Sequence, residues 1–190
     1  MNFDFILECE TSDEKRKKQY EEIYRLIDEA EHIYWVDKSG CAELLCKAAE
    51  QICFAYNDRY EVGFGPDTKL ENFLCYSGGE ADNVMVSRFL SVVRKEQRDR
   101  LNKLRVLGED CALGEAAPDK GMTLEERMEQ NVRRMMETMM IVAADMCNRL
   151  ENKETLKLDK LEFSEETLPV AKPQPPKKKF WQRIFQKPRQ

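Results

Sequence analysis

Residues 123–150 read TLEERMEQNVRRMMETMMIVAADMCNRL, and this stretch decides the fold class that we expect. Thr123 and Glu126 have the spacing of a capping box, in which each side chain satisfies a backbone amide at the start of a helix. Apolar residues then recur at steps of three and four in two adjacent stripes: Met128, Val132, Met135, Met139, Val142, Met146, and Met136, Met140, Ala143, Cys147, Leu150. The pattern predicts a helix over residues 124–151 that packs on two sides within a bundle. Alternatively, its methionines form an adaptable surface for a homodimer or another partner.

Hydrophobic periodicity elsewhere in the chain predicts four further helices. They span roughly residues 13–36, 39–57, 67–76 and 80–107. Ser12 or Asp13 can cap the first helix, and Gly108 is placed to end the fourth. We therefore expect an all-α bundle of about five helices over residues 13–152. Residues 1–12 hold a short apolar patch that predicts either a strand fragment or a hook onto the core.

The charges of the chain are unevenly distributed. The formal net charge is −5, yet residues 172–190 contain seven Lys or Arg and no acidic residue. The rest of the chain has 24 basic against 36 acidic residues, a balance of −12. An acidic body argues against a broad nucleic-acid-binding face, because phosphate recognition needs clustered cations.

The C-terminal residues form a separate unit in this interpretation. Residues 153–176 lose periodicity and gain proline and charge, which predicts a flexible linker. Residues 177–190 predict a basic amphipathic tail with a cationic and an apolar set: Lys177, Lys178, Lys179, Arg183, and Phe180, Trp181, Ile184, Phe185. We expect these eight residues to bind a hydrophobic groove on a protein partner. An anionic membrane surface and single-stranded nucleic acid are the alternatives.

Cysteine usage and hydropathy indicate a cytoplasmic protein. The seven cysteines form no Cys-x-x-Cys pair, and a single histidine is present, so we expect reduced, buried thiols and neither a metal nor a cofactor. The longest uninterrupted apolar stretch, residues 139–144, has six residues and is far shorter than the roughly 20 needed to span a bilayer. The N-terminal residues show no secretory signal. Attachment to a membrane surface through the tail stays open as an alternative.

Residues 101–113 carry a likeness to a known family. They read Leu-Asn-Lys-Leu-Arg-Val-Leu-Gly-Glu-Asp-Cys-Ala-Leu. This resembles the Leu-x-x-Leu-Arg-x-x-Gly-Asn-x-x-x-His segment that closes a helical domain of unknown function. That domain is similar to the N-terminal module of type I restriction endonuclease subunits and to the HEPN (higher eukaryotes and prokaryotes nucleotide-binding) group. Arg105 and Gly108 match the segment, whereas Glu109 replaces its Asn and Leu113 replaces its His.

A second segment carries the same likeness. Residues 30–37 resemble the Ala-Glu-x-x-Tyr-x-x-Asp that ends the first helix of the restriction-subunit module, and Ala49-Glu50 match a pair in its next helix. The likeness covers about residues 15–115. It implies a helical fold and a place in a bacterial defence or mobile-element assembly.

The missing histidine bears on catalysis. Active HEPN ribonucleases pair an Arg with a His a few residues later, and the imidazole assists attack of a ribose hydroxyl on phosphate. No His follows Arg105, and the single one, His32, follows Arg25 at a nominally suitable spacing. We therefore expect a non-catalytic interaction module. The alternative from the enzyme class is a HEPN-type ribonuclease or RNA-binding protein that uses Arg105 or the Arg25/His32 pair.

Overall fold

The computed structural model describes residues 2–76, 79–113, 121–152 and 156–169. Within these ranges the chain is all helical and has no strand, so the predicted fold class is confirmed. The α-helices are α1 (Glu14–Ile33), α2 (Lys38–Arg59), α3 (Leu70–Leu74), α4 (Glu80–Val92), α5 (Lys95–Leu113) and α6 (Leu124–Leu150). Three short 3-10 helices complete the described elements: η1 (Asp4–Ile6), η2 (Leu158–Lys160) and η3 (Glu165–Thr167).

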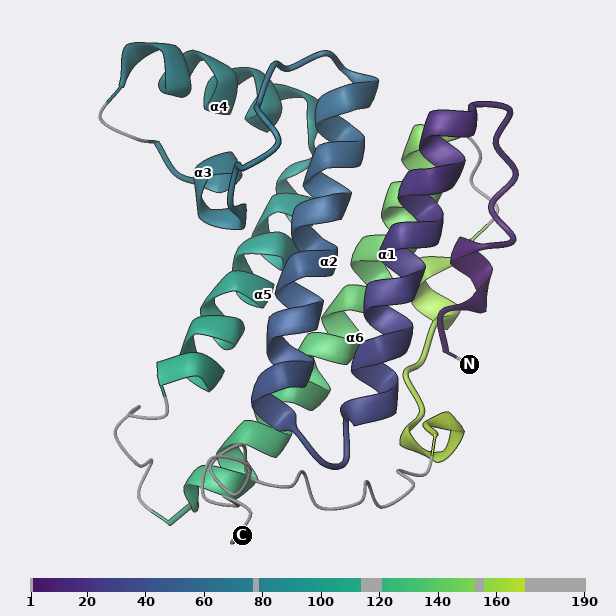
Figure 1. Cartoon of the computed structure of the whole chain (residues 1–190), viewed down its shortest axis with the longest axis vertical. Coiled ribbons are helices and arrows are strands. Elements are labelled where there is room, and N and C mark those ends of the chain that lie inside the picture. The colour runs from purple at the N-terminus through teal and green to yellow at the C-terminus, as the bar shows by residue number, and fades with distance from the viewer. Residues whose placement is uncertain (1, 77–78, 114–120, 153–155, 170–190) are drawn as a thin grey trace, which may run out of the picture.

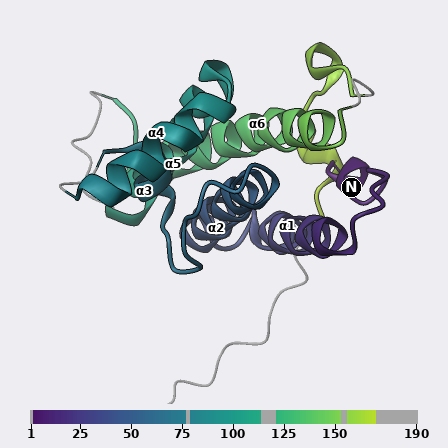
Figure 2. The same ribbon diagram turned by 90° about the horizontal axis from the view of Figure 1, so that it is seen from above.

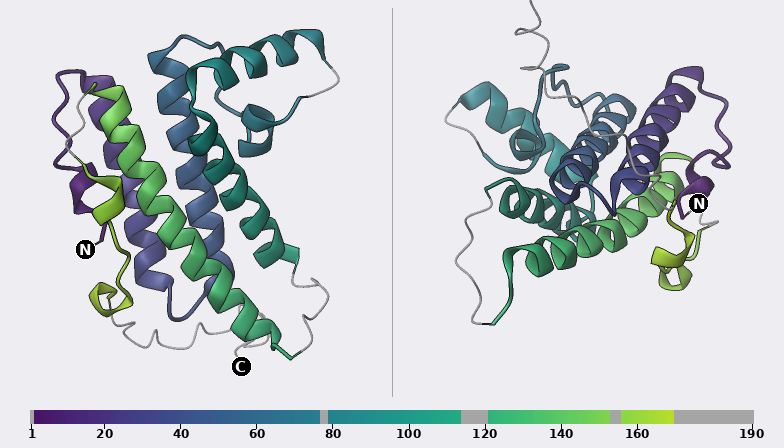
Figure 3. Two further views of the ribbon diagram at one scale, coloured as in Figure 1. Left: turned by 180° about the vertical axis from the view of Figure 1, so that it is seen from behind. Right: turned by 60° about the horizontal axis from the view of Figure 1, so that its bottom comes forward.

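Helix α2 lies at the centre of the molecule. It packs against α1 on one side and α5 on the other, and α6 crosses behind it (Figures 1 and 3). The short helices α3 and α4 cover one end of α2 and α5 (Figure 1). Helix α2 can occupy this position because it buries side chains all around its axis: Cys41, Ala42, Leu45, Ala48, Ala49, Ile52, Cys53, Ala55, Tyr56 and Asn57. Many of these are small, which lets neighbouring helices approach closely.

The starts of α1 and α6 agree with their sequence signals. Thr123 Oγ1 accepts from the backbone N–H of Glu126 at 3.2 Å, and the Glu126 carboxylate accepts from the backbone N–H of Thr123 at 2.7 Å. The predicted capping box is therefore present. At α1 the capping residue is Asp13, whose side chain accepts from the N–H groups of Lys15 and Arg16 at 2.9 and 3.2 Å.

The predicted single helix over residues 80–107 is wrong, because the chain turns at Val93. Helix α4 ends at Val92, Val93 is extended with φ −95° and ψ 127°, and α5 begins at Lys95. Val93 is buried, so the turn is held by its burial in the core. The apolar stripe of α4 faces α3, whereas that of α5 faces α2 and α6. Without a Gly or Pro at the turn, periodicity alone does not reveal it.

Gly108 does not end α5, as the sequence predicted, because the helix continues to Leu113. A Cβ atom at residue 108 would collide with Cys46 Sγ on α2. A glycine inside a helix costs about 1 kcal/mol relative to alanine. Its role here is the close approach of α5 to α2, and it has nothing to do with a helix terminus.

The methionines of α6 form core instead of an exposed surface. Met135, Met136, Met139, Met140 and Met146 are each at most 2% exposed. They contact other helices of the same chain within the hydrophobic core. These five methionines are therefore core residues of the chain, and a homodimer through helix 124–151 stays a prediction that would have to use other residues of the helix.

The predicted boundary of the linker at residue 153 is also wrong, since residues 156–169 pack on the bundle. Leu168 is 5% exposed, and Phe163 contacts the core at Tyr34. The Tyr34 hydroxyl donates to Glu165 at 2.6 Å. We call residues 156–169 the strap. It escaped sequence analysis because its apolar residues follow no helical or strand period.

The N-terminal residues form the hook that was one of the two predicted alternatives. Phe3 and Ile6, in and beside η1, are fully buried between α1 and α6. The strap meets the hook, because the Ser164 backbone N–H donates to Asn2 Oδ1 at 3.1 Å. Figure 1 shows the two segments, purple and yellow-green, side by side next to α1. Together they close the edge of the bundle where α1 and α6 diverge.

Candidate functional site

Arg105 lies at a pocket of about 360 Å³ between α2, α3 and α5. Glu43, Cys46 and Glu50 of α2 line one wall, and Arg105 and Glu109 of α5 line the other. The Arg105 guanidinium forms an ion pair with Glu109 at 2.6 Å and donates to Asn102 Oδ1 at 3.1 Å. The residue that the family likeness singles out therefore faces a pocket, with its charge already neutralised.

The other ionisable groups of this pocket are also occupied. Glu43 forms an ion pair with Lys47 at 2.6 Å, and Glu50 accepts from the backbone N–H of Leu70, at the start of α3, at 3.1 Å. Burial raises the pKa of the Cys46 thiol to about 12, so it is protonated at neutral pH and is a poor nucleophile. These partners favour a structural role for the groups around Arg105.

The candidate pair Arg25 and His32 lies on the exposed face of α1. Arg25 is held in ion pairs by Glu22 at 2.8 Å and Glu29 at 3.1 Å on the exposed face of α1. His32 Nδ1 lies 2.7 Å from the backbone carbonyl oxygen of Asp28. The side chains of Arg25 and His32 are both more than half exposed, and neither residue lines the pocket beside Arg105. Helix α2 separates α1 from α5, so His32 and Arg105 lie on different sides of it (Figure 1).

The described residues contain no group of three His, Cys, Asp or Glu side chains that could hold a metal ion. No helix in the described part of the chain is long and apolar enough to cross a bilayer. The seven cysteines all lie in this part and are free thiols, four of them buried.

The predicted tail residues lie outside the described ranges. They are Lys177, Lys178, Lys179, Phe180, Trp181, Arg183, Ile184 and Phe185. The strap ends at Pro169, directly after the buried Leu168. The described contacts therefore hold the chain against the bundle as far as Leu168.

Sequence analysis missed a second, larger hollow. A pocket of about 650 Å³ lies between the start of α5, the end of α6 and the start of the strap. Arg94, Asp145, Arg149 and Lys157 line it. Residues 94–100, RKEQRDR, looked like the solvated face of one long helix. The density of arginine in that stretch was the available signal, but without the turn at Val93 nothing placed it against residues 145–157.

Comparisons with protein-family models, with curated proteins and with solved structures gave no match to this chain. The functional assignment therefore rests on the contacts, burial and charge of the chain's own residues. These define an all-α bundle with a hydrophobic core and two pockets with charged linings, one between α2, α3 and α5 and the other between the α4–α5 turn, α6 and the strap.

Proposed function

We propose that this chain is a non-catalytic helical interaction module that binds a protein partner through residues 177–190. The observation that supports the first half of the proposal is the separation of Arg105 from His32. General acid–base catalysis needs a titratable group within hydrogen-bond reach of the reacting atoms. An Arg guanidinium stays protonated in proteins and cannot act as a base, and the imidazole lies on the other side of α2.

The anchoring of the strap supports the second half. Leu168 is buried and the Tyr34 hydroxyl donates to Glu165, so the described bundle holds the chain as far as Leu168. The sequence that follows carries seven positive charges and four large apolar side chains, Phe180, Trp181, Ile184 and Phe185. A short amphipathic segment of that kind fits a hydrophobic groove with an acidic rim. The family likeness extends the proposal to a cytoplasmic assembly of bacterial defence or of a mobile element.

A capture experiment tests the tail. Full-length protein, the Trp181→Ala/Phe185→Ala variant and the Lys177→Ala/Lys178→Ala/Lys179→Ala variant are each used as bait in extracts of cells that naturally make the protein. We expect the aromatic variant to lose the bound partner, whereas the lysine variant mainly associates more slowly and with less dependence on salt. The reverse result, loss with the lysine variant alone, contradicts a hydrophobic groove and indicates an anionic membrane surface or nucleic acid.

One observation favours a second candidate, a ribonuclease of the HEPN type. Arg105 lies beside a pocket, where its guanidinium would face a phosphate if Glu109 released it. Incubation of full-length protein with mixed RNA separates the two functions. We expect no cleavage. Cleavage that Arg105→Ala or His32→Ala abolishes would overturn the interaction module in favour of the enzyme.

A further inference from the structure

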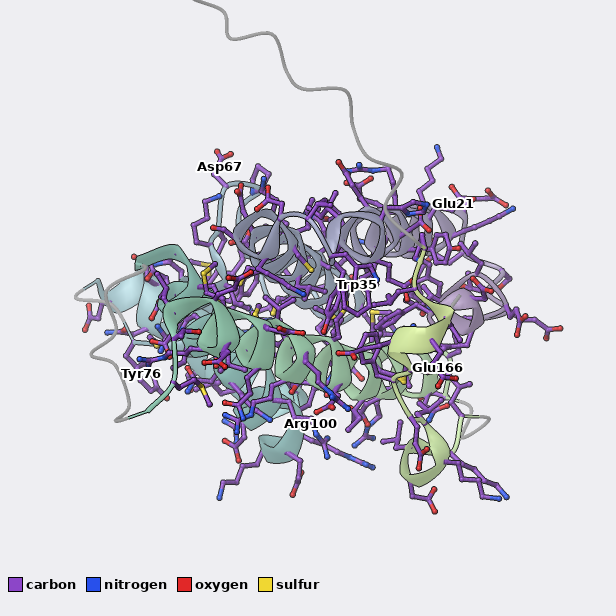
Figure 4. All side chains as sticks on the ribbon, turned by 90° about the horizontal axis from the view of Figure 1, so that it is seen from below. Glu21, Trp35, Asp67, Tyr76, Arg100 and Glu166 are labelled. Carbon is purple, nitrogen blue, oxygen red and sulfur yellow. The ribbon has the colours of Figure 1, made fainter. Side chains whose placement is uncertain are left out.

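We propose that the pocket between α5, α6 and the strap binds a small ligand that carries two or more phosphate groups. We call this pocket the α5–α6 groove. The charged residues that line it are Arg94, Asp145, Arg149 and Lys157. Figure 2 shows that η2 and the junction of α4 and α5 lie on the same side of α6, with α1 and α2 on the other. Arg100 of α5 also points to the side of the molecule away from Trp35 and Asp67 (Figure 4). The groove shares no lining residue with the Arg105 pocket.

The first argument is that the three cations of the groove form no ion pair or side-chain hydrogen bond among the described residues. Within the described residues Arg94, Arg149 and Lys157 form neither an ion pair nor a side-chain hydrogen bond, although the body of the chain carries a balance of −12. By contrast, Arg25 is paired with Glu22 at 2.8 Å and Arg133 with Glu137 at 3.3 Å on other faces of the molecule. Three cations and a single carboxylate, that of Asp145, line this hollow, which leaves an excess of positive charge for an external anion.

The second argument is that the walls are held in place before any ligand arrives. The buried Gln97, one turn after Arg94, donates from Nε2 to the Val142 carbonyl oxygen at 2.8 Å and so pins α5 to α6. Asn148 clasps both backbone groups of Leu156, at 2.8 and 3.0 Å, and this fixes the segment that carries Lys157. Backbone clamps on both sides mean that binding costs little ordering of the protein.

The third argument concerns the floor of the groove. Asp145 is 7% exposed and, among the described residues, has no hydrogen-bond partner. Burial raises the pKa of the Asp145 carboxyl, and the positive charges of Arg94 and Arg100 only partly offset this effect. The Asp145 carboxylate is therefore within electrostatic range of Arg94, which lines the same groove. Its own negative charge repels phosphate, so it sets a limit on affinity that a neutral side chain would remove.

Size and donor geometry select the class of ligand. A volume of about 650 Å³ lies within the range of small-molecule sites. Arginine presents a planar fork of N–H donors that matches phosphate oxygens bidentately, and lysine adds a point charge. The cations come from three separate segments, the turn between α4 and α5, helix α6 and the strap, so a ligand with two or more phosphate groups offers an anionic group to more than one of them.

Isothermal titration of the full-length protein with inorganic pyrophosphate tests the site. We expect binding in wild type and an affinity at least tenfold weaker in Arg94→Gln/Arg149→Gln. The matched control is Arg25→Gln/Arg133→Gln, which removes the same two charges from ion-paired positions and leaves the basic tail intact; it should bind within twofold of wild type. No binding by wild type at millimolar pyrophosphate overturns the proposal, and so does an equal loss in the control, which would show only general attraction.

Two further variants keep the test independent of misfolding. The Lys157 side chain is exposed and forms no ion pair or hydrogen bond among the described residues. Lys157→Gln should therefore weaken binding several-fold. Asp145→Asn should tighten binding several-fold, a gain that an unfolded variant cannot produce. Unchanged affinity in both variants would overturn the placement of the phosphates in this groove. A nucleoside triphosphate that binds like pyrophosphate identifies the phosphate chain as the recognised part, whereas much tighter binding identifies a nucleotide as the source.

Discussion

Gly108→Ala is the substitution with the clearest structural consequence. Residue 108 lies inside α5 at its closest approach to α2, where an added Cβ would collide with Cys46 Sγ. The Cys46 thiol is held there by a hydrogen bond of 3.7 Å to the Leu104 carbonyl oxygen. Met135 Cε, at 3.6 Å from the added atom, is at an ordinary contact distance and need not move. The whole perturbation is therefore concentrated in one pair of residues.

Two opposing free energies decide the size of the effect. Alanine is favoured over glycine inside a helix by about 1 kcal/mol. Overpacking a filled contact costs about 1–3 kcal/mol. We therefore expect Gly108→Ala to lower the free energy of unfolding by about 1 kcal/mol. In a Cys46→Ala background the collision is gone, because Cys46 Cβ would be 4.0 Å from the new atom. There the same substitution should raise stability by about 0.5–1 kcal/mol.

Urea unfolding of wild type, both single variants and the double variant measures this change of sign. The coupling free energy between residues 46 and 108 should be about 1–3 kcal/mol, well above the error of a double-mutant cycle. If Gly108→Ala destabilises the protein equally with and without the Cys46 thiol, the collision is not the reason for a glycine at this position. The helix would then need Gly108 for a different contact.

The remaining predictions concern the strap and the groove. Removing residues 172–190 should leave the midpoint of thermal unfolding unchanged, whereas removing residues 156–190 should lower it. Burial of Leu168 alone stabilises the fold by about 1.5–3 kcal/mol. Each kcal/mol lost lowers the unfolding midpoint of a chain of this size by about 2–4 °C. Burial raises the pKa of Asp145 in the folded state, so its charge opposes folding above its unfolded pKa of about 3.9. Asp145→Asn should therefore increase stability in urea at pH 7 and have no such effect below about pH 4; equal gains at both pH values would contradict the burial of a charged carboxylate.

The likeness to the restriction-associated module and the structure meet at Arg105 and Gly108. Both residues lie on α5 where it borders α2, one in an ion pair at the rim of a pocket and the other in the helix contact below it. Gly108 thus has a packing reason that is independent of any reaction. Arg105 keeps its position with Glu109 as its partner, which is the residue that replaces the Asn of the family segment.

Several elements could be predicted because their signals are local. The capping box at Thr123 and Glu126 and the cap at Asp13 need only a few consecutive residues, and both are present in the structure. The long double stripe of α6 has a single stable solution, a helix with most of its circumference buried. For these elements, backbone hydrogen bonding within the segment and the helical period act together, so the sequence by itself determined them.

Other features depend on residues that are distant in the chain. The turn at Val93 exists because α4 and α5 bury their stripes against different neighbours. The strap is ordered by Tyr34 and Asn2, more than a hundred positions earlier. The α5–α6 groove likewise brings residue 94 to residues 145–157. Hydrophobic periodicity reports which face of a segment is apolar but carries no information on which partner covers it. The helices and their caps were therefore determined by the sequence alone, whereas the turn, the strap and the groove were decided by tertiary packing.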